Sequence, residues 1–200
     1  MSFEHVILFN LTLLAAILSP GPALVMAIRT TLSAGRRAGI AMGFGLGLMA
    51  AVWTAAALLG LETVFAAFPW AYWAAKTLGA AYLIWIAIQM WRGARTPIQT
   101  NLRPAGRAFR DGVLLQAVNP KSALFAAAVL IVIFPPGLSL MDKGLIVLNH
   151  FAVEIAFYTG LSMLLSTQAA QRRYMAAKLY LDRGAAVVMG ALGLRLVLGR

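Results

Sequence analysis

Long apolar stretches alternate with short polar segments along the chain. The stretches show no alternation of apolar and polar residues with a period of two, the pattern typical of membrane strands. A backbone in lipid has to satisfy its hydrogen bonds internally, so each stretch is predicted to be a helix. The predicted membrane helices are Phe3 to Arg29, Ala38 to Leu61, Pro69 to Trp91, Gly112 to Phe134, Gly144 to Thr167 and about Leu179 to Leu198.

The composition supports a membrane protein. Apolar residues make up 62% of the 200-residue chain and charged residues 12%, against about half and about a quarter in soluble domains. Six helices of about 20 residues, with short connections, occupy the whole chain. We therefore expect one transmembrane domain, residues 1–200, surrounded by the lipid bilayer. The sequence has no cysteine and no motif for a metal or a cofactor, so neither is expected.

The net charge of +11 is divided among short basic clusters between the apolar stretches. No soluble domain is predicted to present these clusters to a nucleic acid, so no nucleic-acid partner is expected. Basic residues favour the cytoplasmic side of a membrane, so the connections after the odd-numbered helices should face the cytoplasm and both termini the outside. Arg195 and Arg200 oppose this orientation. The supporting residues are Arg29, Arg36, Arg37, Arg92, Arg95, Arg103, Arg107, Arg110, Arg172, Arg173, Lys178 and Arg183.

An odd number of predicted helices lies on each side of the long basic connection. Three lie in residues 1–100 and three in residues 101–200, so the second half should cross the membrane upside down relative to the first. This is the layout of an inverted repeat. The predicted fold is an all-α membrane protein with six transmembrane helices in two inverted three-helix halves, helices 1 and 4 being broken by proline.

The leading helix of each half is interrupted by Ser19-Pro20-Gly21-Pro22 or by Asn119-Pro120-Lys121. In both, a residue type that caps helices stands directly before a proline. Proline suits the first helical position because its missing N–H would have no partner there. Each interruption is therefore predicted to begin a new half-helix within the membrane, at Pro20 and at Pro120. The plainer alternative is a proline kink in a continuous helix.

Two half-helices that begin near each other direct the positive ends of their dipoles at one volume, which suits an anion. Lys121 adds a full charge and is expected to hold a substrate carboxylate, unless its side chain extends to the membrane surface. Carbonyl groups freed at the preceding helix ends suit an ammonium group. A zwitterionic amino acid carries both groups. The substrate-binding candidates are Ser19, Pro20, Gly21, Pro22, Asn119, Pro120 and Lys121.

Glu154 lies near the middle of the fifth predicted helix. An ionised carboxylate is costly there, so Glu154 should be protonated, paired with Lys121 or exposed to water inside the protein. We take it as a candidate for proton coupling, with a fixed ion pair that joins two helices as the alternative. His5 and His150 are both read as lying near helix ends, and neither is given a role.

Gly35, Gly39, Gly43 and Gly47 recur every four residues and are followed on the same face by Ala51 and Ala55. Such a stripe of small residues lets another helix approach closely. We interpret it as a packing surface that could also allow helices to slide. Gly45 lies off the stripe. The sequence does not decide whether copies of the chain associate with one another.

Four segments together resemble the lysine exporter (LysE/RhtB) family: Ser19 to Pro22, Gly79-Ala80-Ala81-Tyr82-Leu83, Asn119 to Lys121 and Gly193-Leu194-Arg195-Leu196. The resemblance covers essentially the whole chain. It implies an exporter of amino acids or their derivatives in the bacterial cytoplasmic (inner) membrane, driven by the proton gradient. It also implies that the first and third of these segments line the transport path.

Two other functions remain open from the sequence. A membrane scaffold or assembly partner would use the glycine stripe to bind other helices and would transport nothing. A hydrolase would use Ser19 and Lys121 as a catalytic dyad, although no supporting motif for an oxyanion hole is visible. We expect a transporter rather than an enzyme.

Overall fold

The computed structural model describes residues 2–18, 21–95, 107–135, 137–165 and 167–198. Within these residues every regular element is a helix, which confirms the all-α prediction. The helices are α1 (Phe3–Leu18), α2 (Pro22–Ala67), α3 (Pro69–Gly93), α4 (Ala108–Ala117), α5 (Pro120–Ile133), α6 (Leu140–Leu164) and α7 (Gln168–Val197).

Among the described residues, two helices are long and apolar enough to cross a membrane alone, Pro22–Gly60 within α2 and Leu140–Leu164. Helices α4 and α5 form a third apolar segment, bent by 60° at their junction. The protein therefore has two or three clear apolar membrane segments by length and composition. Six crossings and two inverted halves stay predictions.

The largest differences from the predicted helix boundaries lie in α2 and α7. Helix α2 runs past the end of the first predicted helix at Arg29 and breaks at Gly35, whose φ of 83° and ψ of 174° lie outside the helical region. Glycine tolerates this positive φ because it has no Cβ. The predicted start of the last helix near Leu179 is wrong, since α7 begins at Gln168. The basic residues after Gln168, which the sequence predicts to form a connection, lie inside α7.

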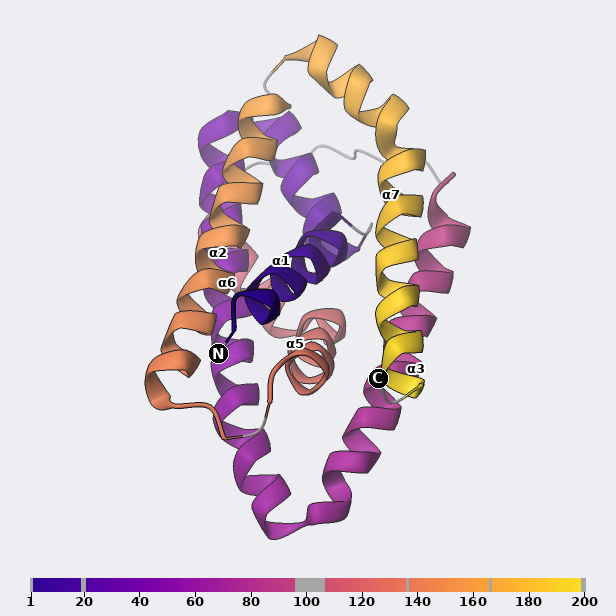
Figure 1. Cartoon of the computed structure of the whole chain (residues 1–200). Helices are drawn as coiled ribbons and strands as arrows, with labels where there is room; N and C mark the ends of the chain where they lie inside the picture. Colours follow the sequence, from indigo (N-terminus) through magenta and orange to yellow (C-terminus); the bar gives the residue numbers. More distant parts are fainter. Residues whose placement is uncertain (1, 19–20, 96–106, 136, 166, 199–200) are drawn as a thin grey trace.

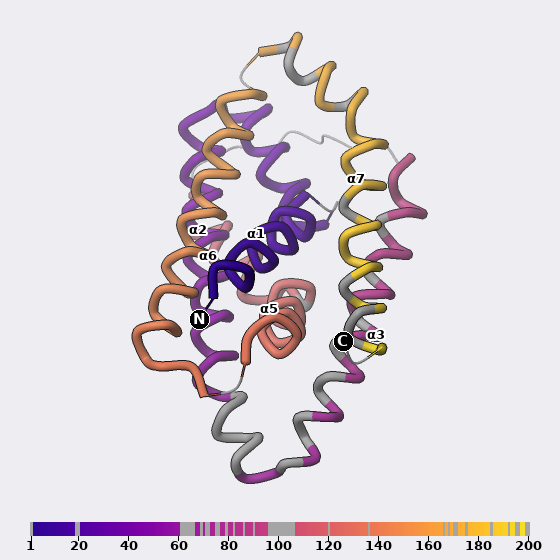
Figure 2. The backbone as a smooth tube through the Cα atoms, in the orientation of Figure 1, coloured from indigo at the N-terminus to yellow at the C-terminus, as the bar shows by residue number. Residues whose placement is uncertain are grey.

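Two helix pairs flank two central helices (Figures 1 and 2). Helix α2 packs against α6 and α4, and α3 packs against α7. Helices α1 and α5 lie between these pairs, where α1 contacts α5, α6 and α7 and α5 contacts α2 and α3. The helix before the first interruption and the helix after the second therefore occupy the middle of the molecule.

Helix α6 runs antiparallel to α2 and lies close to its glycine stripe. A Cβ added at Gly47 would stand 3.1 Å from the Glu154 Cβ, and one added at Gly43 would overlap the Tyr158 Cβ. Gly35 does not take part, because a Cβ there would meet nothing within 4 Å. Including Gly35 in the packing stripe was therefore wrong. The facing pairs are Gly39 with Ser162, Gly43 with Tyr158 and Gly47 with Glu154.

A second close helix contact joins α2 to α4. A Cβ at Gly45 would overlap the backbone carbonyl of Phe109, and one at Gly112 would stand 3.1 Å from the backbone nitrogen of Leu46. The two glycines face opposite helices, so each allows the neighbouring backbone to approach. Gly45, off the stripe in the sequence, packs as closely as the stripe does.

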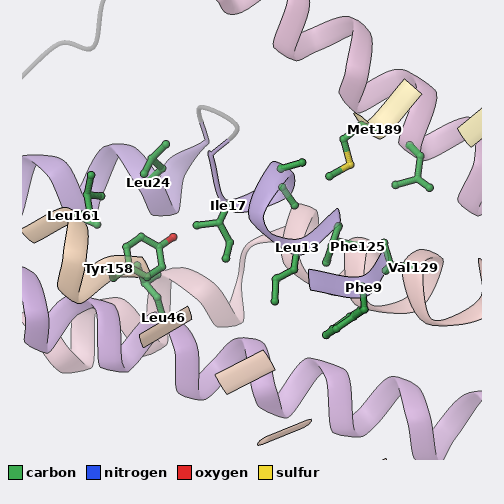
Figure 3. Packing of buried hydrophobic residues seen from close by; sticks show 14 of the residues in the cluster. Phe9, Leu13, Ile17, Leu24, Leu46, Phe125, Val129, Tyr158, Leu161 and Met189 are labelled. Carbon is green, nitrogen blue, oxygen red and sulfur yellow. The ribbon is translucent and has the colours of Figure 1, made fainter. Parts of the chain in front are cut away.

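The buried apolar side chains come from central and flanking helices alike. Figure 3 shows Ile17 and Leu13 of α1 to the right of Tyr158 of α6, with Phe125 of α5 beside Leu13. The Tyr158 hydroxyl points toward Ile17 in this view. Side chains of the central helices therefore share one apolar core with those of the flanking helices.

Candidate functional site

The second interruption begins a new helix in the predicted way. Asn119 has an extended backbone with φ −82° and ψ 103°, and its side-chain oxygen accepts a hydrogen bond of 3.1 Å from the backbone N–H of Lys121. Helix α5 begins at Pro120, the first helical position, where the absent N–H costs nothing. The amide of Asn119 also donates to the side-chain oxygen of Gln116 at 3.1 Å. This second bond fixes the capping side chain against the end of α4.

At the first interruption the new helix begins two residues later than predicted. Helix α2 starts at Pro22, and the carbonyl of Gly21 accepts the first helical hydrogen bond from Val25 N–H at 3.0 Å. Proline still occupies the first helical position, but it is Pro22 rather than Pro20. Ser19 and Pro20 lie outside the described residues.

The side chain of Lys121 points into the protein and not toward a membrane surface. Its Nζ donates a hydrogen bond of 2.9 Å to the carbonyl oxygen of Ala16. Ala16 lies in the last turn of α1, where carbonyls have no partner within the helix. Lys121 therefore binds a carbonyl of the kind expected to receive a substrate ammonium group.

A cavity of about 40 Å³ lies between the two interruptions. It is large enough for a few water molecules. The residues at the beginnings of both α2 and α5 line it, so two helix N-termini meet at one small volume, as the sequence predicts. Its lining includes Gly21, Gln116, Asn119, Lys121, Ser122, His150, Glu154 and Tyr158.

Glu154 lies on the wall of this cavity and is 4% exposed. Its Oε1 is 3.6 Å from Nε2 of His150, one turn earlier in α6. Its Oε2 is buried and accepts no hydrogen bond from the described residues. The side chain also interacts electrostatically with Lys121. Glu154 thus has one oxygen directed at a histidine and one buried oxygen without a hydrogen bond from the described residues.

His150 is a site residue that the sequence analysis missed. It was placed near a helix end, whereas it lies well inside α6 and is 3% exposed. Its Nδ1 is 2.6 Å from the Thr54 hydroxyl of α2, which joins the two packed helices by a buried hydrogen bond. The available signal was its position one helical turn before Glu154, which puts both side chains on the same face.

A buried ion pair in α7 was missed as well. Lys178 was assigned to a connection, but its Nζ donates to Asp182 Oδ2 at 2.7 Å and to the carbonyls of Gly93 and Ala94 at 3.3 and 3.2 Å. The ammonium thereby caps the end of α3 and joins it to α7. Asp182 also interacts electrostatically with Lys121.

The side chains around the cavity can bind a charged ligand, and His150 and Glu154 can each gain or lose a proton. A cation, a carboxylate, a histidine and two helix N-termini surround the space. In the part of the chain that the structure describes, no three His, Cys, Asp or Glu side chains come together as a metal site requires. A small ligand with both a positive and a negative group matches this arrangement of charges.

Comparison with known proteins agrees with this chemistry. The model of the LysE type translocator family matches residues 14–200. The chain is 25% identical to the threonine efflux protein of Escherichia coli K12 over 194 residues, covering 94% of each chain. It is 32% identical to the homoserine/homoserine lactone efflux protein of Salmonella typhimurium LT2 over 176 residues, covering 85% of this chain and 84% of the relative.

No solved structure matches the chain significantly. The family match includes α2 to α7 and the end of α1, so it contains every described residue that lines the polar side of the cavity. These translocators are membrane transporters and not enzymes, which confirms the predicted class. The chain belongs to the LysE type translocator family.

Proposed function

We propose that this protein exports small zwitterionic amino acids across the bacterial cytoplasmic membrane in exchange for protons. The observation that carries the proposal is the hydrogen bond from the Lys121 ammonium to the Ala16 carbonyl in the last turn of α1. This bond lies at a cavity where two helices begin. Two relatives are named as efflux proteins for threonine and for homoserine or its lactone, and threonine and homoserine are small amino acids. Family membership supports export of an amino acid, and the site supports the zwitterionic form.

Substrate binding would exchange the partners of Lys121. The carboxylate of the amino acid takes the Lys121 ammonium, assisted by the N-termini of α2 and α5. The Ala16 carbonyl that Lys121 releases then accepts a hydrogen bond from the substrate ammonium group, and Glu154 supplies the opposite charge. Each charged end of the substrate replaces a contact that is already present, so binding leaves no buried charge without a partner.

Glu154 provides a way to couple this exchange to protons. The substrate ammonium group and a proton compete for the one negative charge of the carboxylate. A protonated Glu154 holds the substrate poorly and an ionised Glu154 holds it well, so substrate and proton occupy the site in turn. Such alternating occupation is what antiport requires, provided that the site opens to each side of the membrane in turn.

The cavity of about 40 Å³ is too small for an amino acid. Transport therefore requires the helices around it to separate. The fold offers a boundary for this movement, since the α2–α6 and α3–α7 pairs stand on opposite sides of α1 and α5. We propose that these pairs move relative to each other about the central helices.

The proposed topology retains one domain of six crossings in two inverted halves. Helices α1 and the part of α2 before Gly35 form the first crossing, and the remainder of α2 forms the second. Helix α3 is the third, α4 with α5 the fourth, and α6 and α7 the last two. Both termini then lie outside, in the orientation that the basic clusters favour.

Transport by purified protein in liposomes tests the proposal. Labelled threonine or homoserine should cross under an imposed pH gradient, and Lys121→Ala should lower the flux about tenfold or more, because a charge-assisted hydrogen bond of about 1.5–3 kcal/mol is lost. Lys143→Ala, which removes a lysine outside the cavity, is the control. A flux that ignores both the gradient and Lys121→Ala contradicts the mechanism.

A scaffold function receives less support from the structure. Three glycines of the stripe already face α6 inside the molecule. Because α6 covers this part of the stripe, it is not a free surface for a partner helix.

A further inference from the structure

The proposed function leaves one titratable residue of the cavity without a role, the buried His150. Both nitrogens of its ring face a partner on a specific helix. Nδ1 lies 2.6 Å from the hydroxyl of Thr54 on α2, and Nε2 lies 3.6 Å from Oε1 of Glu154 on α6. A buried histidine hydrogen-bonded at Nδ1 has a defined ring orientation, which here directs Nε2 at Glu154. The imidazole of His150 is therefore a second group that can hold a proton, and it lies beside Glu154, the candidate proton carrier.

We infer that His150 and Glu154 together carry the transported proton, and that Thr54 holds the His150 ring in position for transfer. The inference rests on the proposed function and adds the residue that shares the proton. It assigns a proton-carrying role to His150 and a positioning role to Thr54.

The transfer step involves one proton and no other reactant. The O–H bond at Oε1 of protonated Glu154 breaks as an N–H bond forms at Nε2 of neutral His150. A carboxylic acid and an imidazole thereby become a carboxylate and an imidazolium, and the total charge of the pair stays zero. When the proton leaves the pair, its charge becomes −1, and this charge is available to a substrate ammonium group.

The present distance of 3.6 Å is that of an ion pair and not of a hydrogen bond. Rotation of the Glu154 side chain has to bring Oε1 closer before a proton can move, as is common for catalytic pairs without their ligand. The unpartnered Oε2 and the adjoining cavity leave room for this rotation.

The proton of the pair lies within reach of the charge on Lys121. Lys121 on α5 faces Glu154 across the cavity, and Tyr158 lies one turn further along α6. Asp182 on α7 acts on the same Lys121. A change in the position of Lys121, which substrate binding would cause, therefore alters the field at Glu154 and shifts the proton toward or away from His150.

The test separates substrate binding from proton coupling by measuring two kinds of transport in liposomes. Exchange of labelled for unlabelled threonine, at equal pH on both sides, needs no net proton movement. Net flux driven by a pH gradient does need net proton movement. His150→Gln keeps a hydrogen-bonding group beside Thr54 but cannot carry a proton. His5→Gln removes the other histidine, which is half-buried and does not line the cavity, and serves as the matched control.

We expect His150→Gln to retain exchange within about threefold of the parent protein, while stimulation of net flux by the gradient falls about tenfold or more, the lower end of the range for loss of a general acid–base group. Thr54→Val should keep some stimulation but move the pH at which it is half-maximal. His5→Gln should leave both measurements unchanged. Retained exchange shows that His150→Gln is folded.

Three results would overturn the inference. Gradient stimulation of His150→Gln equal to that of the parent shows that His150 carries no proton. Equal loss of exchange and stimulation shows that His150 supports the fold or the substrate site instead. A parent protein whose flux ignores the gradient removes the proton coupling altogether, although amino-acid export itself would stand. No amino-acid flux in the parent, by contrast, refutes the proposed function.

Discussion

The close contact between α2 and α6 can be tested by adding a single methyl group at Gly43. The Cβ of an alanine there would overlap Cβ of Tyr158 and stand 3.2 Å from its Cγ. The Tyr158 Cβ is attached directly to the backbone, so a side-chain rotation does not remove the overlap and the helices have to move apart. Overpacking of this kind costs about 1–3 kcal/mol.

Alanine also favours the helix over glycine by about 1 kcal/mol, which opposes the effect. Gly60→Ala supplies the matched control, because Gly60 lies in the same helix and a Cβ there meets nothing within 4 Å. The difference between the two variants isolates the overpacking. For a chain of this size each kcal/mol shifts the melting temperature by about 2–4 °C, so Gly43→Ala should melt about 2–12 °C below Gly60→Ala.

Thermal unfolding of the purified variants in detergent, followed by circular dichroism, measures this difference. Transport should fall as well in Gly43→Ala, because the displaced Tyr158 lines the cavity next to Glu154. If Gly43→Ala and Gly60→Ala melt within about 1 °C of each other, α2 and α6 are not in the close contact described. The register between the glycines and the cavity wall would then be wrong.

Three further changes test the other buried contacts. Asp182→Ala leaves the Lys178 ammonium buried without its carboxylate and should destabilise the protein by about 3–5 kcal/mol in thermal unfolding, with partial recovery when Lys178→Met is added. Asn119→Ala removes the cap of α5 and should cost about 0.5–2 kcal/mol, whereas Asn119→Asp keeps the capping oxygen but loses the hydrogen bond to Gln116 and should recover only part of the stability. Trp91→Ala removes the ring 4.9 Å from the Arg183 guanidinium, and a loss of about 0.5–1 kcal/mol beyond that of Trp91→Phe is expected in unfolding measurements.

The parts of the fold that were predictable depend on local chemistry. The cap at Asn119 and the proline after it are neighbours in the sequence, and they begin α5 as expected. The start of α7 was not predictable in this way. Its first turns carry Arg172 and Arg173, which resemble a polar connection when hydropathy alone is read. Helix formation there depends on the residues that follow, including Lys178 and Asp182, whose charges are compensated inside the protein.

The two charged residues of the candidate site, Lys121 and Glu154, could be predicted from the sequence, whereas His150 was missed. The depth of Lys121 and its place beside a helix break indicate an inward-facing side chain, and its bond to Ala16 agrees. His150 was missed because α6 begins at Leu140, four residues before the predicted start, so the histidine lies deeper than it seemed. Its contact with Thr54 joins residues 96 positions apart, which a local pattern does not reveal.

The bond from Lys121 to Ala16 also bears on how the protein is made. The two residues are 105 positions apart in the chain. At about 5–20 residues per second, the ribosome adds the second partner roughly 5–20 seconds after the first. During that interval the open carbonyls at the end of α1 need water or the insertion machinery as a temporary partner. The contact at the proposed transport site therefore forms only after α5 has been synthesised, and a chain truncated before α5 would expose uncompensated polar groups to quality control.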